Sequence, residues 1–593
     1  MSARELITEH LDLWTGAVTK KSSSGRGGNG KVELTGVKRL RELILQLAVT
    51  GRLVEQDASE EPATELIKRI QAGKEQLSLS SKQRKAKPLP PISESERPFP
   101  LPPGWVLSRL DDITDIQGGI AKGKKVAGRR TRILPYLRVA NVQRSSLDLS
   151  EIKEIEIAEE EIERYLVRQG DLLITEGGDW DKVGRTAIWD GRLEPMAHQN
   201  HVFRARLILR EQNERWLERY LNSRFARDYF AGSSKQTTNL ASINKTQLRS
   251  CTVPLPPLEE QHRIVQKVDE LMALCDRLEQ QTSDQLEAHE TLVDTLLDTL
   301  TQSENATDLA ENWARLAAHF DTLFTTEQSI DKLKQTILQL AVMGRLVEQD
   351  VGDESGANLL TQIYTRKTAL ADDKKIKRPR PLTQLDDIQH SYPAPAHWAW
   401  ASFEDIADEI STGPFGSMIH KHDYVENGIP LVNPSHMANG EIKEDSSVSV
   451  TTAKAEELSS YKVANGDIVM ARRGEVGRCA IVTDRESGWI CGTGSFVLRF
   501  HPAINRRFIL LLFSTNTVRE YLSGNSVGTT MTNLNHGILK KMPVALPPAK
   551  EQHRIVQKVD ELTALCDQLK ERLNQASETR NQLAEAVVQG ALN

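Results

Sequence analysis

Cysteine is scarce in this chain: there are five in 593 residues, an odd number, and no Cys-x-x-Cys pair. This usage is typical of a reducing compartment and argues against both a disulfide framework and structural zinc. Long apolar runs are also lacking, since no stretch approaches the roughly 18 consecutive apolar residues of a membrane span. The opening MSARELITEHLDLW lacks the basic and apolar regions of a secretory signal. We therefore expect a cytoplasmic protein that does not contact a membrane.

Aromatic residues make up only 5 %, and the mean hydropathy of -0.44 leans polar and helical. At roughly 100–200 residues per domain, a chain of 593 residues is expected to hold about four domains. The net charge is -6, but the charge is unevenly distributed. Residues 255–350 contain 7 Lys or Arg against 19 Asp or Glu, whereas residues 100–254 contain 25 against 21. The second of these segments is therefore free to contact phosphates.

The chain repeats itself. ILQLAVTGRLVEQD at 44–57 returns as ILQLAVMGRLVEQD at 337–350, with 13 of 14 positions identical. LPPLEEQHRIVQKVDELMALCDRL at 255–278 returns at 546–569, with 20 of 24 positions identical. The segments between these blocks share only a skeleton of a tryptophan, a Gly-Asp, a Val-Gly-Arg and a Thr-Thr. One conserved frame therefore carries two divergent inserts.

The frame is predicted to be helical, because apolar residues in its second block follow a heptad pattern of alternating four- and three-residue spacings. Each of these helices follows a Pro-Pro pair, which suits a helix start, and the first is predicted to run from Pro257 to about Thr301. Shorter helices are predicted at about 37–50 and 330–343, each followed by a glycine. The apolar heptad positions of each long helix form a seam that another helix must cover. The N-terminal helix should cover the seam of the last helix, which gives a circular, pseudo-twofold molecule. The alternative is that the heptads mediate dimerisation between chains.

Each insert is predicted to be a mixed α+β domain. Runs such as DLLIT, GRTAIW and SFVLRF are typical of strands, and helices are predicted near 213–230 and 504–522. Basic, proline-containing segments at 80–91 and 372–381 are predicted to be exposed linkers.

Several segments approach enzyme motifs, and each departs at a residue that the chemistry needs. Gly25–Gly30 has the spacing of a dinucleotide fingerprint but follows lysines and serines rather than a strand. Gly118–Lys124 resembles a P-loop, but Lys125 replaces the hydroxyl that would bind magnesium. Asn433–His436 lacks the aromatic residue that stacks on an extruded base. We therefore predict no catalytic, cofactor-binding or metal site on this chain.

The P-loop-like segment has another interpretation. Lys122 and Lys124 lie in a basic loop that suits DNA phosphates, and the alternative is an ordinary solvated loop.

The ordered, repeated motifs resemble the specificity subunits of type I restriction-modification systems. They are LPPLEEQHRIVQKVDEL and its second copy, PYLRVANVQ at 135–143, GDLLITEGGDWDKVGR at 170–185, GDIVMARRGEVGR at 466–478 and the ILQLAV-x-GRLVEQD pair. The resemblance covers nearly the whole chain. It implies an α+β fold in which two mixed α/β target recognition domains are separated by long antiparallel coiled-coil helices, in agreement with the circular pseudo-twofold repeat.

The resemblance also implies a division of labour. Each recognition domain would bind one half of an asymmetric, bipartite site in double-stranded DNA. Two modification subunits would dock on this chain and bring S-adenosylmethionine for adenine methylation, and restriction subunits would add ATP- and magnesium-dependent translocation and cleavage. This chain would itself hold no cofactor. Two other functions stay open: a DNA-modifying enzyme with its own catalytic site, and a helical scaffold that does not bind DNA.

The domain boundaries follow from the repeat. We expect an N-terminal extension and linker at 1–36, a conserved helix with a basic linker at 37–99, the first recognition domain at 100–254, a helical spacer at 255–350, a linker at 351–391, the second recognition domain at 392–545, and a C-terminal conserved helix at 546–593. The extension departs from the family pattern, and its Leu6, Leu11, Leu13 and Trp14 suit either a docking helix or a capping helix.

Candidate DNA-contacting residues are polar side chains predicted on loops beside the shared skeleton. In the first domain they are Arg138, Asn141, Gln143, Arg144, Lys182, Thr237 and Thr238, and in the second they are Asn433, His436, Arg472, Arg473, Thr529 and Thr530. Arginine pairs well with guanine, and Asn or Gln with adenine, but each candidate suits a phosphate contact or a structural role as well.

Overall fold

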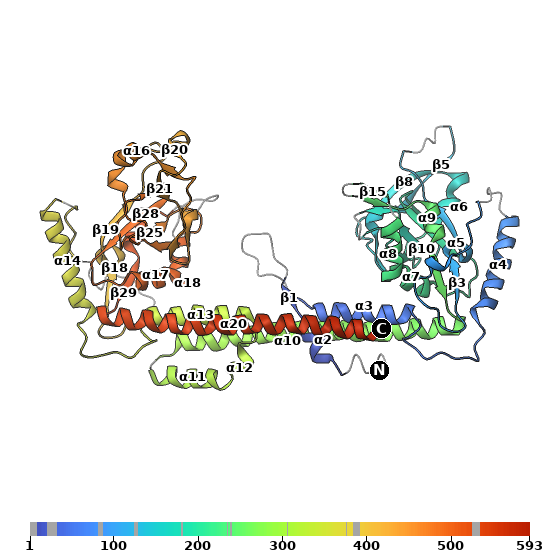
Figure 1. Cartoon of the computed structure of the whole chain (residues 1–593), viewed down its shortest axis with the longest axis horizontal. Helices are drawn as coiled ribbons and strands as arrows, with labels where there is room; N and C mark the ends of the chain where they lie inside the picture. The colour runs from blue at the N-terminus through green and yellow to red at the C-terminus, as the bar shows by residue number, and fades with distance from the viewer. Residues whose placement is uncertain are drawn as a thin grey trace. The chain divides into compact units, whose positions relative to one another are not determined.

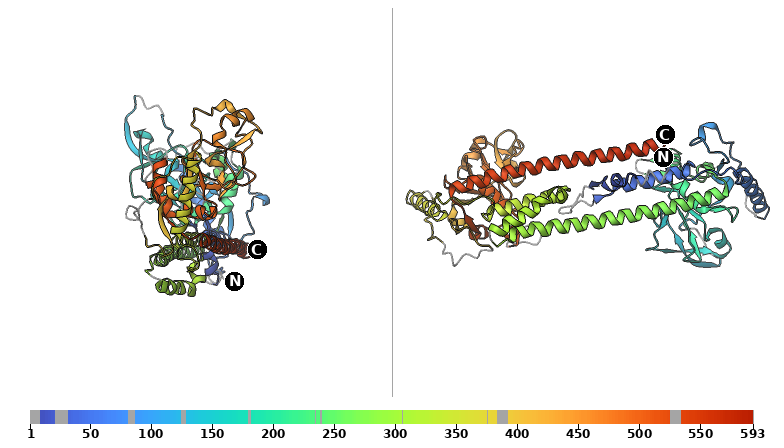
Figure 2. Two further views of the ribbon diagram at one scale, coloured as in Figure 1. Left: turned by 90° about the vertical axis from the view of Figure 1, so that its left-hand side faces the viewer. Right: turned by 90° about the horizontal axis from the view of Figure 1, so that it is seen from below.

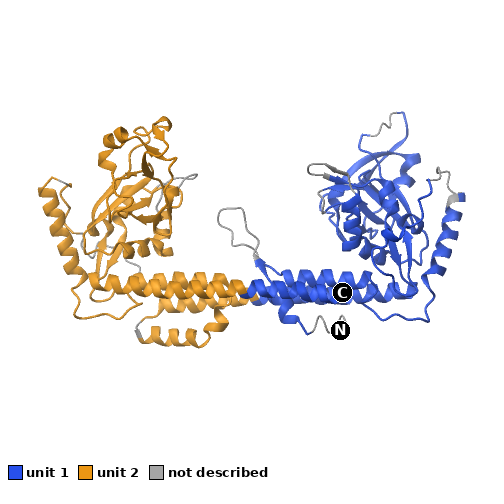
Figure 3. Cartoon of the chain, viewed as in Figure 1, with its two compact units in different colours: residues 1–285, 576–593 blue, residues 286–575 orange. Residues whose placement is uncertain are grey.

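The computed structural model describes residues 9–20, 32–80, 87–123, 128–178, 182–233, 235–237, 240–304, 306–374, 376–382, 392–524 and 534–592. The chain divides into two compact units, residues 1–285 with 576–593 and residues 286–575 (Figures 1 and 3). Each unit holds one insert domain packed on a bundle of helices, and each insert shares an apolar core with its own bundle.

Two long helices belong to both units. Helix α10 (Leu258–Gln302) begins in the first unit and ends in the second, whereas α20 (Ala549–Leu592) begins in the second and ends in the first. The prediction of a helix from Pro257 to about Thr301 is confirmed. Within the described ranges, neither these helices nor any other is long and apolar enough to cross a membrane.

In the first unit, α3 (Thr35–Val49) lies between the start of α10 and the end of α20 (Figure 2). Thr35 Oγ1 donates a hydrogen bond to Asn581 Oδ1 (2.9 Å), and Arg39 is 3.2 Å from the Glu585 carboxylate. Because the residue numbers of the contacting pairs increase in the same direction along both helices, α3 and the end of α20 run parallel. These contacts join the two ends of the sequence within one bundle, so the predicted circular closure is confirmed.

The same helix runs antiparallel to α10. Arg41 contacts Asp276 (2.7 Å) early in α3, and Gln56, which follows α3, contacts Glu260 at the start of α10 (2.6 Å). Of the heptad residues predicted in this helix, Ile264, Val268, Leu271 and Cys275 are buried in the core that contains Leu40, Leu43, Ile44 and Leu47 of α3, whereas Leu278 is half-buried.

The second unit repeats this bundle with α13 (Glu327–Val342) as its short helix. Lys332 is 2.6 Å from Asp294 of α10, whereas Lys570 of α20 is 3.0 Å from Asp331. Ile555 and Val559 of α20 are buried in the core that α13 enters. Since both seams are covered from within the chain, the alternative of heptads that mediate dimerisation is disfavoured.

The N-terminal extension caps the first bundle. Helix α2 (Leu11–Gly16) buries Trp14 completely in the core shared with α3, while Leu11 is exposed. Gly36 makes this packing possible, since a Cβ there would lie 2.2 Å from the Trp14 carbonyl oxygen. In the second unit, α12 (Phe320–Leu323) takes the same place before α13, after α11 (Ala306–Ala318). The extension thus repeats an internal segment; Leu6 lies outside the described residues.

The first insert is closed by a two-stranded stem and contains two four-stranded sheets, β12-β10-β14-β4 and β8-β5-β13-β9. Its elements are β3 (Val106–Arg109), α5 (Leu110–Ile113), β4 (Thr114–Gly118), β5 (Thr131–Leu137), the 3-10 turn η2 (Val139–Asn141), β6 (Val142–Gln143), β7 (Ser146–Leu147), β8 (Lys153–Ala158), α6 (Ile162–Tyr165), β9 (Leu166–Val167), β10 (Leu172–Thr175), β11 (Gly177–Gly178), β12 (Thr186–Ile188), β13 (Met196–His198), β14 (Val202–Leu207), α7 (Glu214–Asn222), α8 (Arg224–Ser233), β15 (Lys235–Thr237), β16 (Leu240–Ser242), α9 (Lys245–Ser250) and β17 (Thr252–Leu255).

The second insert has the sheets β19-β28-β25-β26 and β20-β24-β21-β27. Its elements are β18 (Ala399–Ser402), α15 (Phe403–Ile406), β19 (Ala407–Thr412), β20 (Tyr424–Val425), β21 (Ile429–Val432), the 3-10 turn η6 (Pro434–His436), β22 (Met437–Ala438), β23 (Glu441–Ile442), β24 (Ser449–Val450), α16 (Thr452–Glu457), β25 (Ile468–Ala471), β26 (Cys479–Ile481), β27 (Ile490–Cys491), β28 (Ser495–Phe500), α17 (Arg506–Ser514), α18 (Asn516–Gly524), α19 (His536–Lys541) and β29 (Pro543–Leu546).

The two inserts have the same scaffold although their sequences diverge. The stems β3–β17 and β18–β29 are both antiparallel, and the parallel pair of β5 with β13 recurs as β21 with β27. The first sheets match strand for strand, β4-β14-β10-β12 against β19-β28-β25-β26. The α+β class predicted for both inserts is confirmed.

Helices α4 (Ala63–Ser80) and α14 (Gly356–Asp372) were not predicted, since they lie within the segments 37–99 and 351–391 that the sequence analysis assigns largely to linker. Their buried stripes consist chiefly of one i, i+4 pair each, Leu66 with Ile70 and Leu359 with Ile363. So short a stripe gives little periodic signal.

One further expectation changes in detail. The helices predicted near 213–230 and 504–522 are each broken in two, because Ser223 and Thr515 adopt extended backbone conformations. The first linker is exposed at Pro90 and Pro91, as predicted, and Arg109 donates to their carbonyl oxygens (3.1 and 3.4 Å), which ties the linker to the insert.

A buried glutamate fastens each insert to its bundle. Glu260, in the first turn of α10, is 1 % exposed and accepts hydrogen bonds from Trp105 Nε1 (2.9 Å) and Gln56 Nε2 (2.6 Å). Burial raises the pKa of its carboxyl group. This carboxylate therefore joins the start of the long helix, the turn after α3 and the residue that directly precedes β3 of the insert.

The second unit contains the same clamp. Glu551 accepts from Trp398 Nε1 (3.0 Å) and Gln349 Nε2 (2.6 Å), and burial again raises its pKa. Gly344, with φ +72°, turns the chain beneath Trp398, where a Cβ would lie 2.8 Å from the ring. The identical blocks of the sequence thus meet at one point in each unit.

We predict that Trp105→Phe destabilises the first unit by about 1–3 kcal/mol, because a buried carboxylate oxygen loses its donor. Trp398→Phe is the matched control and should act on the second unit. Hydrogen exchange resolved by peptide should show faster exchange only in the unit that carries the substitution. Equal loss of protection in both units for either variant would contradict a local clamp.

Candidate nucleic-acid interface

In the first insert, the loops at the ends of several strands meet at one surface. Three backbone hydrogen bonds of 2.9 Å join them: Ile120 N–H to His198 O, Gln199 N–H to Leu137 O, and Glu176 N–H to His201 O. We call residues 119–123, 138–143, 176–178 and 198–201 the first loop edge. Binding residues are often carried on such loops, because the sheets hold the loops in place.

The second insert forms the corresponding surface. Its loops are joined by hydrogen bonds from Gly413 N–H to Ser495 O (3.0 Å), Gly492 N–H to Val432 O (2.9 Å) and Arg472 N–H to Gly494 O (3.0 Å). We call residues 413–417, 433–436, 472–474 and 492–494 the second loop edge.

The matching bonds show which positions are equivalent. The backbone N–H of Glu176 donates to the residue that precedes β14, and the backbone N–H of Arg472 donates to the residue that precedes β28. The backbone oxygen of Glu176 accepts from Ile243 N–H, and that of Arg472 accepts from Leu534 N–H (both 2.9 Å). The chain takes the same path here with opposite charge on the side chain. Arg138 and Asn433 are likewise equivalent, because each directly follows the strand of the parallel pair, β5 or β21.

The two edges differ in electrostatics. In the first, Glu176 Oε2 is 2.6 Å from His201 Nδ1, so acid and base are paired. In the second, the Arg472 guanidinium lies 5.3 Å from the centroid of the Phe496 ring, and its buried Nε has no hydrogen-bond partner among the described residues. Burial and the neighbouring Arg473 lower the pKa of Arg472. Two adjacent arginines without a carboxylate partner in the described part of the chain suit an anionic ligand.

Two candidate residues are buried rather than exposed on these edges. Asn141 accepts from the Arg138 N–H (2.9 Å) and donates to the carbonyl oxygens of Asp148 (2.8 Å) and Glu151 (3.0 Å). His436 is 8 % exposed, with Nδ1 2.9 Å from the Leu431 oxygen. Both side chains stabilise the 3-10 turn after the parallel strand, which favours a positioning role for them, and their predicted DNA contacts stay predictions.

The other candidates are partly or fully accessible where the structure describes them. Lys122 and Arg473 are exposed, and Arg138, Gln143, Arg144, Lys182, Asn433 and Arg472 are half-buried. Gln143 is held by Arg185 (2.7 Å), and Arg138 donates to the Glu151 oxygen (2.9 Å). Thr237 ends β15, while Lys124, Thr238, Thr529 and Thr530 lie outside the described residues. Their DNA contacts stay predictions.

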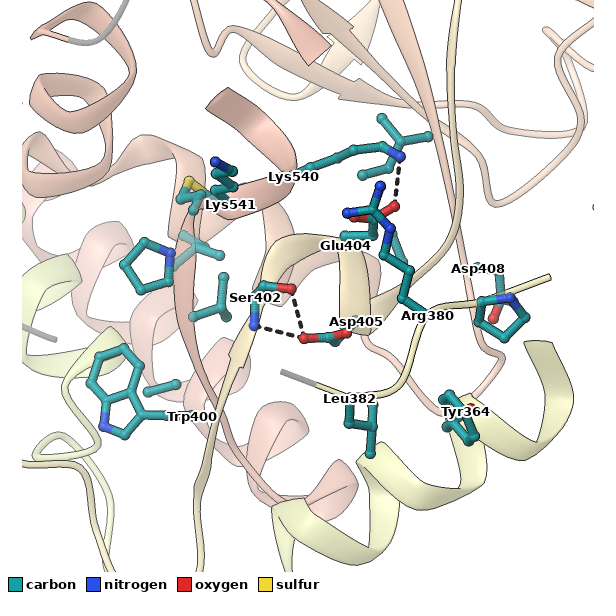
Figure 4. Close-up of a pocket in the computed structure, with 18 of the residues that line it drawn as sticks. Tyr364, Arg380, Leu382, Trp400, Ser402, Glu404, Asp405, Asp408, Lys540 and Lys541 are labelled. Atoms are coloured by element: carbon teal, nitrogen blue, oxygen red, sulfur yellow. Dashed lines mark hydrogen bonds and ion pairs between the residues drawn. The ribbon is translucent and has the colours of Figure 1, made fainter. Parts of the chain in front are cut away.

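A cavity of 1490 Å³ in the second unit lies beside α14, β18 and β29 (Figure 4). Two of its lysines are held by Glu404: Lys540 donates to the Glu404 carboxylate (2.6 Å), and Lys367 donates to the Glu404 backbone carbonyl oxygen (2.6 Å). The cavity shares no residue with the predicted site. Among the described residues, no group of three or more His, Cys, Asp or Glu side chains is placed to hold a metal ion.

Comparison with known proteins identifies the family. Residues 102–288 and 404–578 match the type I restriction modification DNA specificity domain. The chain belongs to this family of specificity subunits. It is 35 % identical to the EcoEI specificity subunit of Escherichia coli over 608 residues, and 35 % identical to the EcoAI specificity subunit of the same species over 606 residues. Each alignment covers 100 % of both chains.

A solved structure is also similar. The HsdS subunit from Thermoanaerobacter tengcongensis shares 18 % identity and a TM-score of 0.40, and the match covers 84 % of this chain and 99 % of that one. The resemblance inferred from the repeated motifs is confirmed by the family match. Specificity subunits recognise DNA and direct its methylation and restriction, and one match falls in each insert with its adjoining helix.

Sequence reasoning overlooked Glu176, His201 and Phe415 on the loop edges of this specificity subunit. Glu176 could have been predicted from the sequence. Aligning the two inserts at their shared Gly-Asp places GDLLITE opposite GDIVMAR, and hence Glu176 opposite Arg472. His201 becomes apparent only through its contact with Glu176. Phe415 had no signal, since a sequence does not show which phenylalanine is left exposed.

We predict that Arg473→Ala lowers the salt dependence of duplex binding, because one phosphate contact is lost, with a slope change of about 1 in a plot of log K against log salt. Arg507→Ala is the control, since Arg507 is exposed but already paired with Asp560 (2.9 Å) on α20. Binding titrations at several salt concentrations would measure both slopes. An unchanged slope for Arg473→Ala would remove this residue from the interface.

Proposed function

We propose that the chain is the non-catalytic DNA-binding subunit of a type I restriction-modification complex, and that each insert contacts one half of an asymmetric, bipartite site in double-stranded DNA. The observation that carries this proposal is the pair of loop edges. The same backbone hydrogen bonds present Glu176 in one insert and Arg472 in the other. Different side chains on one scaffold suit two different half-sites, because base recognition depends on the donor and acceptor pattern of each side chain.

The repeated frame supports identical partners. The blocks at 255–278 and 546–569 are nearly the same, and each supplies the same buried clamp. Two equal surfaces suit two copies of one subunit. We infer that two modification subunits bind this frame and hold S-adenosylmethionine, and that restriction subunits hold ATP and magnesium.

The first prediction from this proposal concerns catalysis. The purified chain should transfer no methyl group from labelled S-adenosylmethionine, hydrolyse no ATP and cleave no DNA, because its motifs depart from those of the corresponding enzymes. Adding the modification subunits should restore methyl transfer to DNA. Turnover by the chain alone would favour the alternative of a self-contained enzyme.

The second prediction concerns modularity. Replacing residues 100–254 with the insert of a relative should change one half of the methylated motif, since the stem β3–β17 closes this insert as a unit. The reciprocal control replaces residues 392–545 and should change the other half. The measurement is methylome sequencing of a host that expresses the complete system, and a change in both halves or in neither would contradict modular recognition.

A further inference from the structure

Phe415 is a large apolar side chain with 68 % of its surface exposed, at the tip of a loop on the second loop edge. An exposed aromatic ring keeps apolar surface in water, where burial would stabilise it by roughly 25 cal/mol per Å². Single exposed apolar residues are common on proteins, so exposure alone decides nothing. The position of Phe415 on the second loop edge, which also contains residues predicted to contact DNA, makes its exposure relevant to binding.

The loop that carries Phe415 is held firmly at its base. Gly413 N–H donates to Ser495 O (3.0 Å), and a Cβ on Gly413 would lie 2.1 Å from the Gly492 oxygen, so this backbone approach requires glycine. Pro414 restricts the next backbone angle. Met418 N–H then closes the turn on Phe415 O (2.8 Å). The ring therefore projects from a fixed backbone.

The surroundings point to an anionic partner with apolar faces. Ser495, which holds the base of the loop, directly follows Gly494, and Gly494 contacts both arginines. Its backbone oxygen accepts from Arg472 N–H (3.0 Å), and a Cβ on Gly494 would lie 3.6 Å from the Arg473 side chain. Two cations without a carboxylate partner among the described residues thus lie on the backbone segment that also holds the base of the Phe415 loop. DNA offers phosphates to the two arginines, and it offers base faces or thymine methyl groups to the aromatic ring.

The first insert lacks this feature at the equivalent point. Gly119 matches Gly413, since a Cβ on Gly119 would lie 2.3 Å from the Gln199 oxygen, and the second residue after it is Ala121. The ring is therefore specific to one insert and suits a contact with one half-site.

We propose that Phe415 makes a desolvated contact with a base of the DNA half-site bound by the second insert, and so helps to determine its sequence. This inference rests on the proposed function. The ring would either stack on a base or pack against a thymine methyl group, and both are apolar contacts that supply sequence preference without charge.

The test is duplex binding by the purified full chain, with DNA that carries the motif methylated in a host expressing the complete system. Phe415→Ala should weaken this binding about tenfold or more, as expected for loss of one aromatic contact with a base. Binding to unrelated duplex and the salt slope should stay unchanged, because no charge is removed. Phe415→Tyr should retain binding. Val351→Ala, which shortens an apolar side chain that is 85 % exposed outside the inserts, is the matched control and should have no effect.

Modified bases distinguish the two forms of contact. Replacing thymine by deoxyuridine should weaken wild-type binding at one position if the ring packs on a methyl group, whereas 2-aminopurine fluorescence should rise on binding if the ring disturbs stacking. Equal binding of the motif by Phe415→Ala and wild type would overturn the inference while leaving the proposed function intact. Failure of the wild-type chain to bind duplex DNA would overturn both.

Discussion

The buried carboxylate at the start of each long helix is the interaction on which the rest of the molecule depends. Glu260 and Glu551 are each 1 % exposed, and each joins a helix start, the turn after a short helix and the tryptophan that directly precedes the first strand of an insert. A buried carboxylate is unfavourable unless donors surround it, so all three segments must be in place together. This requirement couples each recognition domain to its bundle.

This coupling leaves the far end of each insert free to vary. The stems and the first sheets of the two inserts agree strand for strand, and matching backbone hydrogen bonds hold Glu176 and Arg472. Backbone bonds do not depend on side-chain identity, so the loop edges can exchange Glu176 for Arg472, or Ala121 for Phe415, without altering the scaffold. Divergent DNA preference and an invariant frame are therefore compatible within one chain.

Much of the frame could be predicted, because long apolar periodicity is a strong signal. The heptads, the Pro-Pro starts and the glycines after the short helices gave α10, α3, α13 and the circular closure. Helices α4 and α14 escaped prediction because their buried stripes are short. The candidate site was predictable only as a region: Arg472 and Arg473 lie on a loop edge, whereas Asn141 and His436 are buried and hold turns.

The amino-acid sequence by itself determined the repeat, the helical frame, the α+β class of the inserts and the family, because these depend on periodicity and on residue identities in order. Only the tertiary structure decided between the predicted closure of the heptad helices within the chain and their dimerisation, between a docking and a capping role for Trp14, and which polar side chains face outward. Those properties arise from contacts between residues far apart in the sequence, such as Arg39 with Glu585 and Glu176 with His201. Local pattern carries no record of such contacts, since they exist only once the chain has folded.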